Sequence, residues 1–250
     1  MLPLHDLYSQ HAALSLEKQL ALGEIIGDRD FSFDATTGTL GFGDDLAFPM
    51  QVLGSVSRQS STWLWAWASP QPLPKQLLQA AQQLKALATG QGIGELYEES
   101  FDIISPPAPV ESLLDMHQRL TSFGHAPEPL DGHLIAMLAA GVCQADAYYG
   151  ADYGRGIAYV LLPRVPGTEA HRSDVPTAMA TVFAELLQLP YPLDHRAAFG
   201  AYVQQKGYVA ETNGRQVRGT EGSQAITATF DSTNRLTALE ADGTQVAVSG

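Results

Sequence analysis

The residues best suited to acid–base or metal chemistry are the seven histidines, and their spacing gives no metal site. None lies three or four positions from another histidine or in a His-Glu-x-x-His arrangement, which would place two ligands on one helical face. The seven are His5, His11, His117, His125, His133, His171 and His195. A metal site could still form from ligands in distant segments, but the sequence predicts no metal ligand.

One adjacent pair, Asp194 and His195, has the composition of an acid–base couple. Neighbouring residues on a helix point about 100° apart, so the two side chains would not face each other. We therefore expect Asp194 to be the N-cap of a helix that begins at His195. The chain as an enzyme is the alternative hypothesis, with a site that converges from separated segments and uses His195, His133 or Asp194.

No motif supplies a nucleophile or a phosphate-binding loop. The stretch Gly90-Gln-Gly92-Ile-Gly94 lacks the glycine spacing of a dinucleotide-binding loop, and there is neither a P-loop nor a Gly-x-Ser-x-Gly elbow. Cys143 ends an apolar run and is expected to be a buried, inert thiol. The sequence thus predicts no catalytic residue and no cofactor, and it favours a protein that is not an enzyme.

The most informative polar stretch is residues 144–156, in which tyrosines alternate with aspartates and glycines. We expect a loop there that presents rigid aromatic side chains beside negative charge, as protein-binding hot spots do. Its candidate contacts are Tyr148, Tyr149, Asp152 and Tyr153. Two acidic pairs would add charge to the partner-binding surface: Asp44, Asp45, Glu98 and Glu99. The alternative is a helix end and a turn whose tyrosines pack on the edge of the domain.

The balance of charge limits what such a surface would bind. The 250 residues include 14 Lys and Arg against 27 Asp and Glu, a formal net charge of −13 at pH 7. An acidic surface repels phosphate, so direct binding of nucleic acid or of an anionic membrane is disfavoured. The expected partner is a basic protein.

Cysteine usage and the N-terminal residues favour a cytoplasmic protein. A single cysteine cannot form an internal disulfide, which fits a reducing compartment. The first 20 residues lack the basic start, apolar core and small-residue cleavage site of a secretory signal. No apolar run approaches the roughly 20 residues that span a bilayer.

Periodicity predicts mixed helices and strands in the first half of the chain. We expect an amphipathic helix over 4–22, a β-hairpin over 31–42, strands over 50–56 and 101–104, a helix over 75–88 and a short helix over 93–99. Residues 62–68 read Thr-Trp-Leu-Trp-Ala-Trp-Ala, which places three indoles on one face and smaller apolar residues on the other. A strand that is apolar on both faces is expected to be central in its sheet.

The second half predicts a similar mixture. We expect helices over 110–123, 133–147, 176–187 and 195–205, and strands over 157–162, 208–217, 225–230 and 236–239. Because helices and strands cluster rather than alternate, the fold class is α+β, with antiparallel sheets packed with helices in two similar-sized halves. The prolines at 106–109 suggest a domain boundary, with an N-terminal α+β domain over 1–109 that contains the Trp-rich central strand and a C-terminal α+β domain over 110–250 that ends in β-hairpins.

Two segments near the ends of the chain resemble each other. Residues 32–40 and 229–236 each place a phenylalanine and an aspartate before a polar turn and a leucine. The simpler interpretation is two similar hairpin turns, because aspartate and asparagine favour turns through local hydrogen bonds. Duplication of a whole half is the alternative.

The motif Leu53-Gly54-Ser55, followed by Trp63-Leu-Trp65-Ala-Trp67-Ala-Ser69, resembles an uncharacterised bacterial family. Its members carry a leucine-glycine-serine step and then a Trp-x-Trp-Ala-Trp-Ala-Asn strand, and here Ser69 stands in place of the asparagine. The resemblance covers about the first hundred residues, including residues 92–96. The aromatic run serves packing, so the resemblance transfers no functional residue.

Proteins of this appearance are similar to cytosolic immunity proteins, which neutralise secreted nuclease toxins such as type VI secretion effectors. The resemblance therefore implies an acidic immunity protein that inhibits a cognate toxin by occlusion. This hypothesis needs no catalytic residue, and it agrees with the negative charge because a nuclease has a cationic groove for its substrate. The alternatives are the enzyme described above and a scaffold or housekeeping protein of unknown partner.

Overall fold

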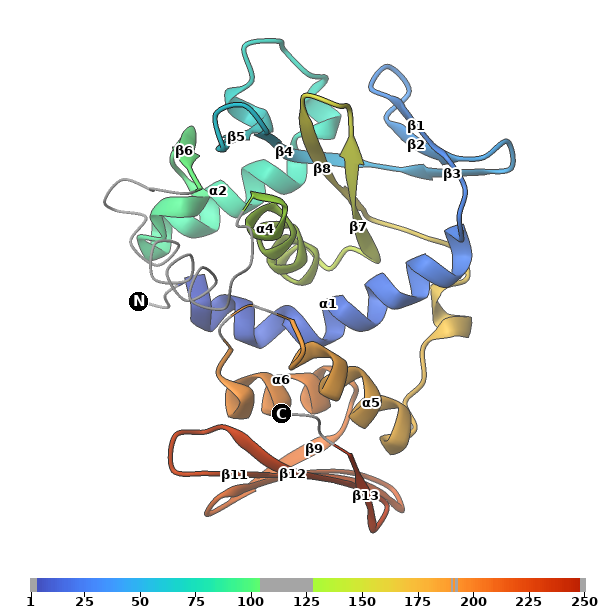
Figure 1. Ribbon diagram of the computed structural model, residues 1–250, viewed down its shortest axis with the longest axis vertical. Coiled ribbons are helices and arrows are strands. Elements are labelled where there is room, and N and C mark those ends of the chain that lie inside the picture. The colour runs from blue at the N-terminus through green and yellow to red at the C-terminus, as the bar shows by residue number, and fades with distance from the viewer. Residues whose placement is uncertain (1–3, 104–127, 190, 192, 248–250) are drawn as a thin grey trace.

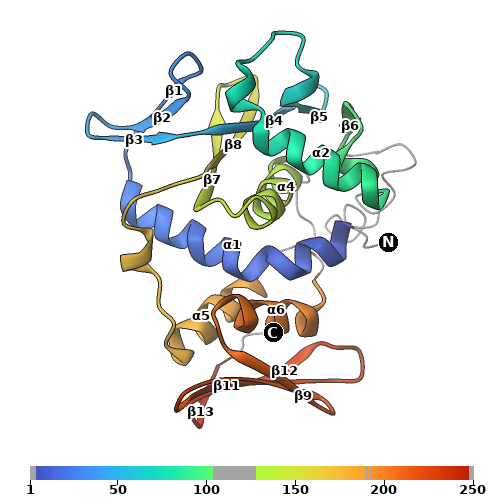
Figure 2. The same cartoon turned by 180° about the vertical axis from the view of Figure 1, so that it is seen from behind.

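The computed structural model describes residues 4–103, 128–189, 191 and 193–247, and its layers stack on either side of one central helix (Figure 1). Helix α1 (Leu4–Ile26) crosses the middle of the molecule. On one side lie α2 (Gln79–Gln91), α4 (Glu128–Val142) and two sheets; on the other lie α5 (Pro176–Leu186), α6 (His195–Gln205) and a third sheet (Figure 2). All strand pairs in the described residues are antiparallel, and the predicted α+β class is confirmed.

The predicted first helix is α1, and it is buried along two sides rather than one. Leu7 and Tyr8 near its start and Ala12 and Leu16 further along are buried in a single core that includes residues of α4 and of α6. A Cβ on Gly141 of α4 would collide with His11 of α1, so the glycine lets these two helices approach closely. The central helix is therefore the common packing surface of both halves.

The first five-stranded sheet, called here the upper sheet, has the order β6-β5-β4-β8-β7. Its strands are β4 (Gln51–Ser57), β5 (Thr62–Trp65), β6 (Ser100–Asp102), β7 (Ala147–Asp152) and β8 (Gly156–Leu162). The face toward α2 and α4 carries Trp63, Trp65 and Tyr159, all with no exposed surface. Trp63 and Trp65 meet edge to face at 5.1 Å between ring centroids, an arrangement that the aromatic quadrupole favours.

The predicted strand over 62–68 is wrong in length, and it is an interior strand of the sheet without being the middle one. The strand ends at Trp65, and residues Ala66–Ala68 form the 3₁₀ helix η1. Trp67 therefore leaves the face of Trp63 and Trp65, and Lys85 of α2 lies over its ring at 3.4 Å. The middle strand of the sheet is β4, with β5 beside it, since only the pairing of distant segments decides which strand is central.

A small three-stranded sheet, of order β1-β2-β3, packs on the opposite face of the upper sheet. It consists of β1 (Phe31–Asp34), β2 (Thr39–Phe42) and β3 (Leu46–Pro49), so the predicted hairpin over 31–42 is confirmed. Leu40 and Phe42 form a second buried cluster with Val160 and Leu162 of β8. The upper sheet is thus covered on both faces, but on this outer face only in part.

The second five-stranded sheet, called here the C-terminal sheet, is a meander of order β13-β12-β11-β10-β9. Its strands are β9 (Val209–Asn213), β10 (Gln216–Glu221), β11 (Gln224–Phe230), β12 (Leu236–Ala241) and β13 (Thr244–Val246). Val217, Ile226 and Phe230 are buried in the core that also contains residues of α5 and α6. The strands over 225–230 and 236–239 were predicted; residues 208–217 instead belong to two strands joined by a turn.

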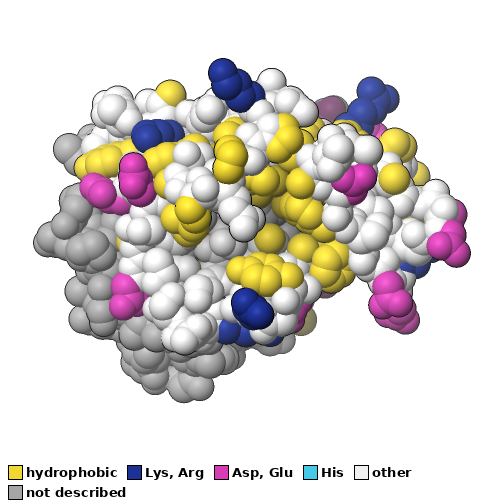
Figure 3. All heavy atoms as spheres, turned by 90° about the horizontal axis from the view of Figure 1, so that it is seen from above, with side chains coloured by type: hydrophobic (Ala, Val, Ile, Leu, Met, Phe, Trp, Pro, Cys, Tyr) yellow, Lys and Arg dark blue, Asp and Glu magenta, His cyan; other side chains and the backbone are white. Residues whose placement is uncertain are grey.

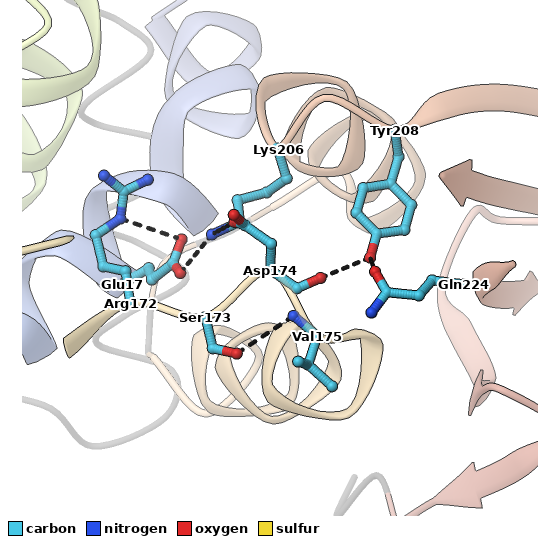
Figure 4. A network of polar contacts seen from close by, with 8 residues as sticks. All are labelled: Glu17, Arg172, Ser173, Asp174, Val175, Lys206, Tyr208 and Gln224. Atoms are coloured by element: carbon cyan, nitrogen blue, oxygen red, sulfur yellow. Dashed lines mark hydrogen bonds and ion pairs between the residues drawn. The ribbon is translucent and has the colours of Figure 1, made fainter. Parts of the chain in front are cut away.

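A buried ionic network joins this C-terminal part to the central helix (Figure 4). Lys206, which follows α6, lies 2.7 Å from Glu17 of α1 and 2.6 Å from Asp174, measured from Nζ to the carboxylate oxygens. The side chains of Lys206 and Glu17 are 1% and 4% exposed. Such a pair costs desolvation energy, and removing one partner would leave the other charge unpaired.

The predicted boundary at residue 109 does not separate two independent sheets. Strand β8 pairs with β4 from Gln51 to Ser57, so residues from both sides of the boundary share one sheet. The boundary and the helix predicted over 110–123 lie outside the described residues. The two resembling hairpins belong to sheets of different strand order, and in each the aspartate, Asp34 or Asp231, accepts backbone hydrogen bonds within its turn.

Candidate partner-binding surface

The outer face of the upper sheet contains a hollow of about 210 Å³. Small or apolar residues line its floor, among them Gly54, Ser55, Leu64 and Ala158. Its remaining lining residues are Phe33, Val52, Trp65, Ala66, Ser69, Leu73 and Tyr153. Figure 3 shows hydrophobic side chains gathered in the middle of this face, with charged side chains around them. We refer to this feature as the outer hollow.

The floor of the outer hollow follows from strand register. Ser55 pairs with Leu64 of β5 on one side and with Ala158 of β8 on the other, so the three side chains share the outer face. Towards the other end of β8 the same face carries Val160 and Leu162, which the three-stranded sheet covers. The small sheet stops short of Ser55, Leu64 and Ala158, and these three side chains stay partly exposed.

Two exposed aromatic residues form walls of the outer hollow. Phe33 of β1 is 39% exposed and Tyr153 is 55% exposed, and both are among the largest apolar side chains that face solvent in the described residues. Exposed apolar area that is gathered around a concavity is typical of a binding surface, whereas single exposed hydrophobic residues are ordinary.

A rigid turn between β7 and β8 positions Tyr153. The Tyr153 N–H donates to the carbonyl of Gly156, and Gly154 adopts a left-handed φ of +85°. Asp152 accepts from the Gly154 N–H at 2.7 Å and from Arg58 at 2.6 Å. These contacts, the Gly154 hydrogen bond first, hold the pKa of the Asp152 carboxyl below its usual value. Tyr153 is thus presented by a turn that is tied to the end of β4.

The structure separates the four candidate contacts of residues 144–156. The predicted loop is wrong because residues 147–152 form strand β7, whose pairing with β8 the local sequence does not reveal. Tyr148 is 5% exposed and faces His133 of α4, and burial raises the pKa of its phenol. Tyr149 packs against Phe42 at 5.0 Å between ring centroids. Of the four residues, Tyr153 lines the hollow, with Asp152 beside it.

The acidic pairs do not belong to the outer hollow. Asp44 and Asp45 lie in the turn between β2 and β3, where Asp45 pairs with Arg29 at 3.2 Å. Glu98 and Glu99 lie between the 3₁₀ helix η3 (Gly94–Leu96) and β6, and the Glu99 carbonyl accepts from the Trp65 N–H. None of the four lines the hollow. Their contribution to partner binding stays a prediction that concerns long-range charge.

The residues of the alternative enzyme site have separate structural contacts. Asp194 caps α6 by accepting from the Ala197 N–H at 2.9 Å, as predicted. His195 Nδ1 accepts from the Leu236 N–H at 3.1 Å, which places the ring against β12. His133 packs on Tyr159 at 5.3 Å between ring centroids, at the upper sheet. The histidines thus contact different sheets, and no shared site brings them together.

Other features of the described residues are less suited to binding a ligand than the outer hollow is. A groove of about 470 Å³ runs along α6, but Asp194 and Arg196 in its lining are engaged, the latter with the Gly214 carbonyl at 2.7 Å. Burial raises the pKa of the Cys143 thiol to about 11, which keeps it protonated at neutral pH. Across 4–103 and 128–247 with their gaps, no three His, Cys, Asp or Glu side chains form a group that could hold a metal ion. No helix there is long and apolar enough to cross a membrane.

The sequence did not single out Phe33, Ser55, Leu64 or Ala158 as functional. Phe33 was visible as part of an alternating strand, and Leu64 as the outward neighbour of two tryptophans. Their meeting depends on pairings between segments about a hundred residues apart, such as Ser55 with Ala158. A signal available in advance was Phe31 and Phe33 on the same side of a short strand, which indicates an apolar contact beyond the hairpin itself.

Comparison with known proteins supplies a family and no further relative. The model of a family of unknown function, DUF6882, matches residues 5–165. The match includes α1, the upper sheet and the three-stranded sheet, and it ends before the 3₁₀ helix η4 (Thr168–His171). No curated protein and no solved structure matches the chain.

Proposed function

The chain belongs to DUF6882, a family of unknown function, and we propose that it is a cytoplasmic immunity protein that binds a basic toxin and inhibits it by occlusion. The observation that carries this proposal is the outer hollow, where two exposed aromatic residues form the walls around a floor of small or apolar residues. Aromatic residues around a desolvated centre supply most of the binding energy in protein interfaces. The hollow is small for a substrate site but sufficient for anchoring side chains of a protein.

The charge distribution supports a basic partner. Residues 1–165 include 18 acidic and 8 basic residues, a net charge of −10, and residues 166–250 include 9 acidic and 6 basic residues, a net charge of −3. The part of the chain that forms the outer hollow therefore carries most of the negative charge. Opposite charge on a partner would steer the encounter and raise the association rate.

A nuclease is the kind of toxin that best fits these features. Any nuclease needs a cationic groove for the phosphate backbone of its substrate, and an acidic protein that covers this groove competes with the substrate. Occlusion requires a stable surface and no catalytic group on the inhibitor.

The test uses the products of the genes that adjoin the gene of this chain. Each product would be expressed with and without the chain, and growth, nuclease activity and complex formation would be measured. We expect one product to be toxic alone, to be rescued by the chain, and to bind it in a 1:1 complex whose affinity falls as salt rises. If the chain neither binds nor inhibits any of these products, the proposed function is wrong.

A further inference from the structure

Strand β1 has a free edge beside the outer hollow. It is the outermost strand of the three-stranded sheet and pairs only with β2 in the part of the chain that the structure describes. Ser32, Phe33 and Asp34 are exposed, and Phe33 lines the hollow. An edge strand presents unpaired N–H and C=O groups, which are a template for another strand.

The three-stranded sheet is a layer that covers only part of the outer face. Its side chains Leu40, Phe42 and Phe48 pack with Val160 and Leu162, whereas Ser55, Leu64 and Ala158 lie beyond its reach. Adjacent strands lie about 4.8 Å apart. One more strand on the edge of β1 would therefore extend this layer toward the uncovered floor.

We propose that the protein partner docks by adding an extended segment to the free edge of β1 and by placing an apolar side chain in the outer hollow. This inference rests on the proposed function, namely that the surface binds a basic protein. Side chains on a strand alternate between its faces, so every second residue of the segment would point to the hollow. The volume of about 210 Å³ has room for one large side chain or two small ones.

Charge indicates the composition of the rest of the segment. Asp34 follows Phe33 and Asp152 precedes Tyr153, while the exposed Arg155 lies two residues after Tyr153, so the charge immediately beside the hollow is mixed. Asp34 Oδ1 accepts from the Thr36 N–H at 2.8 Å, so this carboxylate is fixed at the end of β1. Arg58 already pairs with Asp152, which leaves Asp34 as the freer anion. Asp34 and the net charge of −13 of the whole chain favour a segment that alternates apolar residues with lysine or arginine.

The probe is the synthetic peptide Arg-Val-Lys-Phe-Lys-Val-Arg, labelled with a fluorophore and titrated with the full chain. Two further peptides of the same sequence carry N-methyl groups on one or the other alternate set of amides. Only one set can face β1 in a paired strand, so we expect one methylated peptide to lose at least tenfold in affinity and the other to bind like the parent. Equal affinities of the two methylated peptides would overturn strand pairing.

Two matched variants test the hollow itself. Ala158→Phe fills the floor of the outer hollow, and Ala238→Phe makes the same change on the outer face of the C-terminal sheet. We expect the first to weaken binding of the parent peptide at least tenfold and the second to leave it unchanged, with both variants folded by circular dichroism. Equal affinity of the two variants for the peptide would place its binding elsewhere and overturn the inference.

The two proposals fail in different ways. If an adjoining toxin is inhibited but binds Ala158→Phe as tightly as the unaltered chain, the docking mode is wrong and the proposed function stands. If the peptide binds with the expected pattern but no adjoining gene product is bound, the proposed function is wrong and the docking site stands.

Discussion

The two five-stranded sheets of this molecule have similar inner faces and different outer faces. Each packs two helices on its inner face, α2 and α4 in one case and α5 and α6 in the other. One row across the outer face of the C-terminal sheet is polar on all five strands, namely Glu211, Arg218, Thr227, Glu240 and Gln245, while Val209 on the edge strand β9 is exposed on the same face. The upper sheet instead carries an apolar floor between two aromatic walls.

This difference indicates which outer face is suited to solvent and which is suited to contact with a partner. An antiparallel sheet with one solvated face alternates apolar and polar residues, and the C-terminal sheet follows that rule. The upper sheet departs from it where the three-stranded layer ends, at Leu64 and Ala158 on either side of Ser55. The C-terminal sheet shows that a polar row on the outer face is compatible with folding. Folding therefore does not require the partly exposed apolar residues of the upper sheet. Binding is the reason we infer.

The largest effects are expected on the inner faces, where the two sheets are alike. Trp63→Ala and Phe230→Ala each remove a side chain with at most 1% exposed surface. Each is expected to lower the free energy of unfolding by about 3–5 kcal/mol through lost burial and a cavity. Chemical denaturation measures both. A loss of less than about 1 kcal/mol in either variant would contradict the claim that both sheets are stabilised by a buried inner face.

A slightly smaller effect is expected where the C-terminal part joins the central helix. Lys206→Met leaves Glu17 buried without its closest cation, so we expect a loss of about 3 kcal/mol. The matched control is Arg58→Met, which removes a pair whose side chains are 46% and 48% exposed and should cost at most about 1 kcal/mol. Equal losses in urea denaturation would show that the buried network does not hold the two parts together.

Acid is expected to weaken both parts of the molecule. Burial lowers the pKa below the usual 6.5 for His11 on the central helix, for His133 beside the upper sheet and for His195 beside the C-terminal sheet. The unfolded chain then takes up protons first, so stability is complete above pH 6.5 and declines as the pH falls toward the lowered values. Unfolding free energies at pH 7.5, 6.5 and 5.5 measure this decline.

A matched control for this prediction is His195→Gln, which removes one of the three groups. It should flatten the decline between pH 7.5 and 5.5 while costing stability at pH 7.5, because the glutamine amide does not place an acceptor where the ring Nδ1 accepts from the Leu236 N–H. Stability that rises on acidification would contradict the prediction.

The smallest effect on stability is expected for a swap of polarity between the outer faces. Leu64→Thr makes the upper sheet more like the C-terminal sheet, and Thr227→Leu does the reverse. Both positions are partly exposed, so each change should alter the unfolding free energy by less than about 1 kcal/mol. The apolar dye bis-ANS should bind the unaltered chain and bind Leu64→Thr more weakly. Thr227→Leu should add no dye site, since one leucine on a flat face makes no hollow; a new site there would contradict this account.

Features set by short stretches of sequence were predictable. The helix over 4–22, the hairpin over 31–42 and the Asp194 cap depend on periodicity, turn residues and one side-chain acceptor, all of which are local. Features set by pairing of distant segments were not. The pairing of β4 with β8 joins segments about a hundred residues apart. Residues 147–152 were missed for a different reason: their glycine and aspartate look like a loop, although they pair with β8 across a turn of three residues.

The residues of the candidate site also divide into those that the local sequence indicates and those that depend on strand pairing. Tyr153 was predicted because an exposed tyrosine among glycines and aspartates is conspicuous in the sequence. Tyr148 was chosen for the same reason and is buried, since alternate residues of a strand face opposite sides of the sheet. The floor of the outer hollow was not predictable at all, because it exists only where β4, β5 and β8 meet and the three-stranded layer ends.

The central claim is that the partner binds at the outer hollow and the edge of β1, and not at the C-terminal sheet. Hydrogen exchange of the full chain, free and bound to the adjoining gene product that it is proposed to inhibit, tests this claim most directly because it follows both surfaces in one experiment. The account predicts slower exchange on binding in β1 and in the turn over 152–156, with no change in β10, β11 and β12. Slower exchange confined to the C-terminal sheet, or no change in β1, would contradict it.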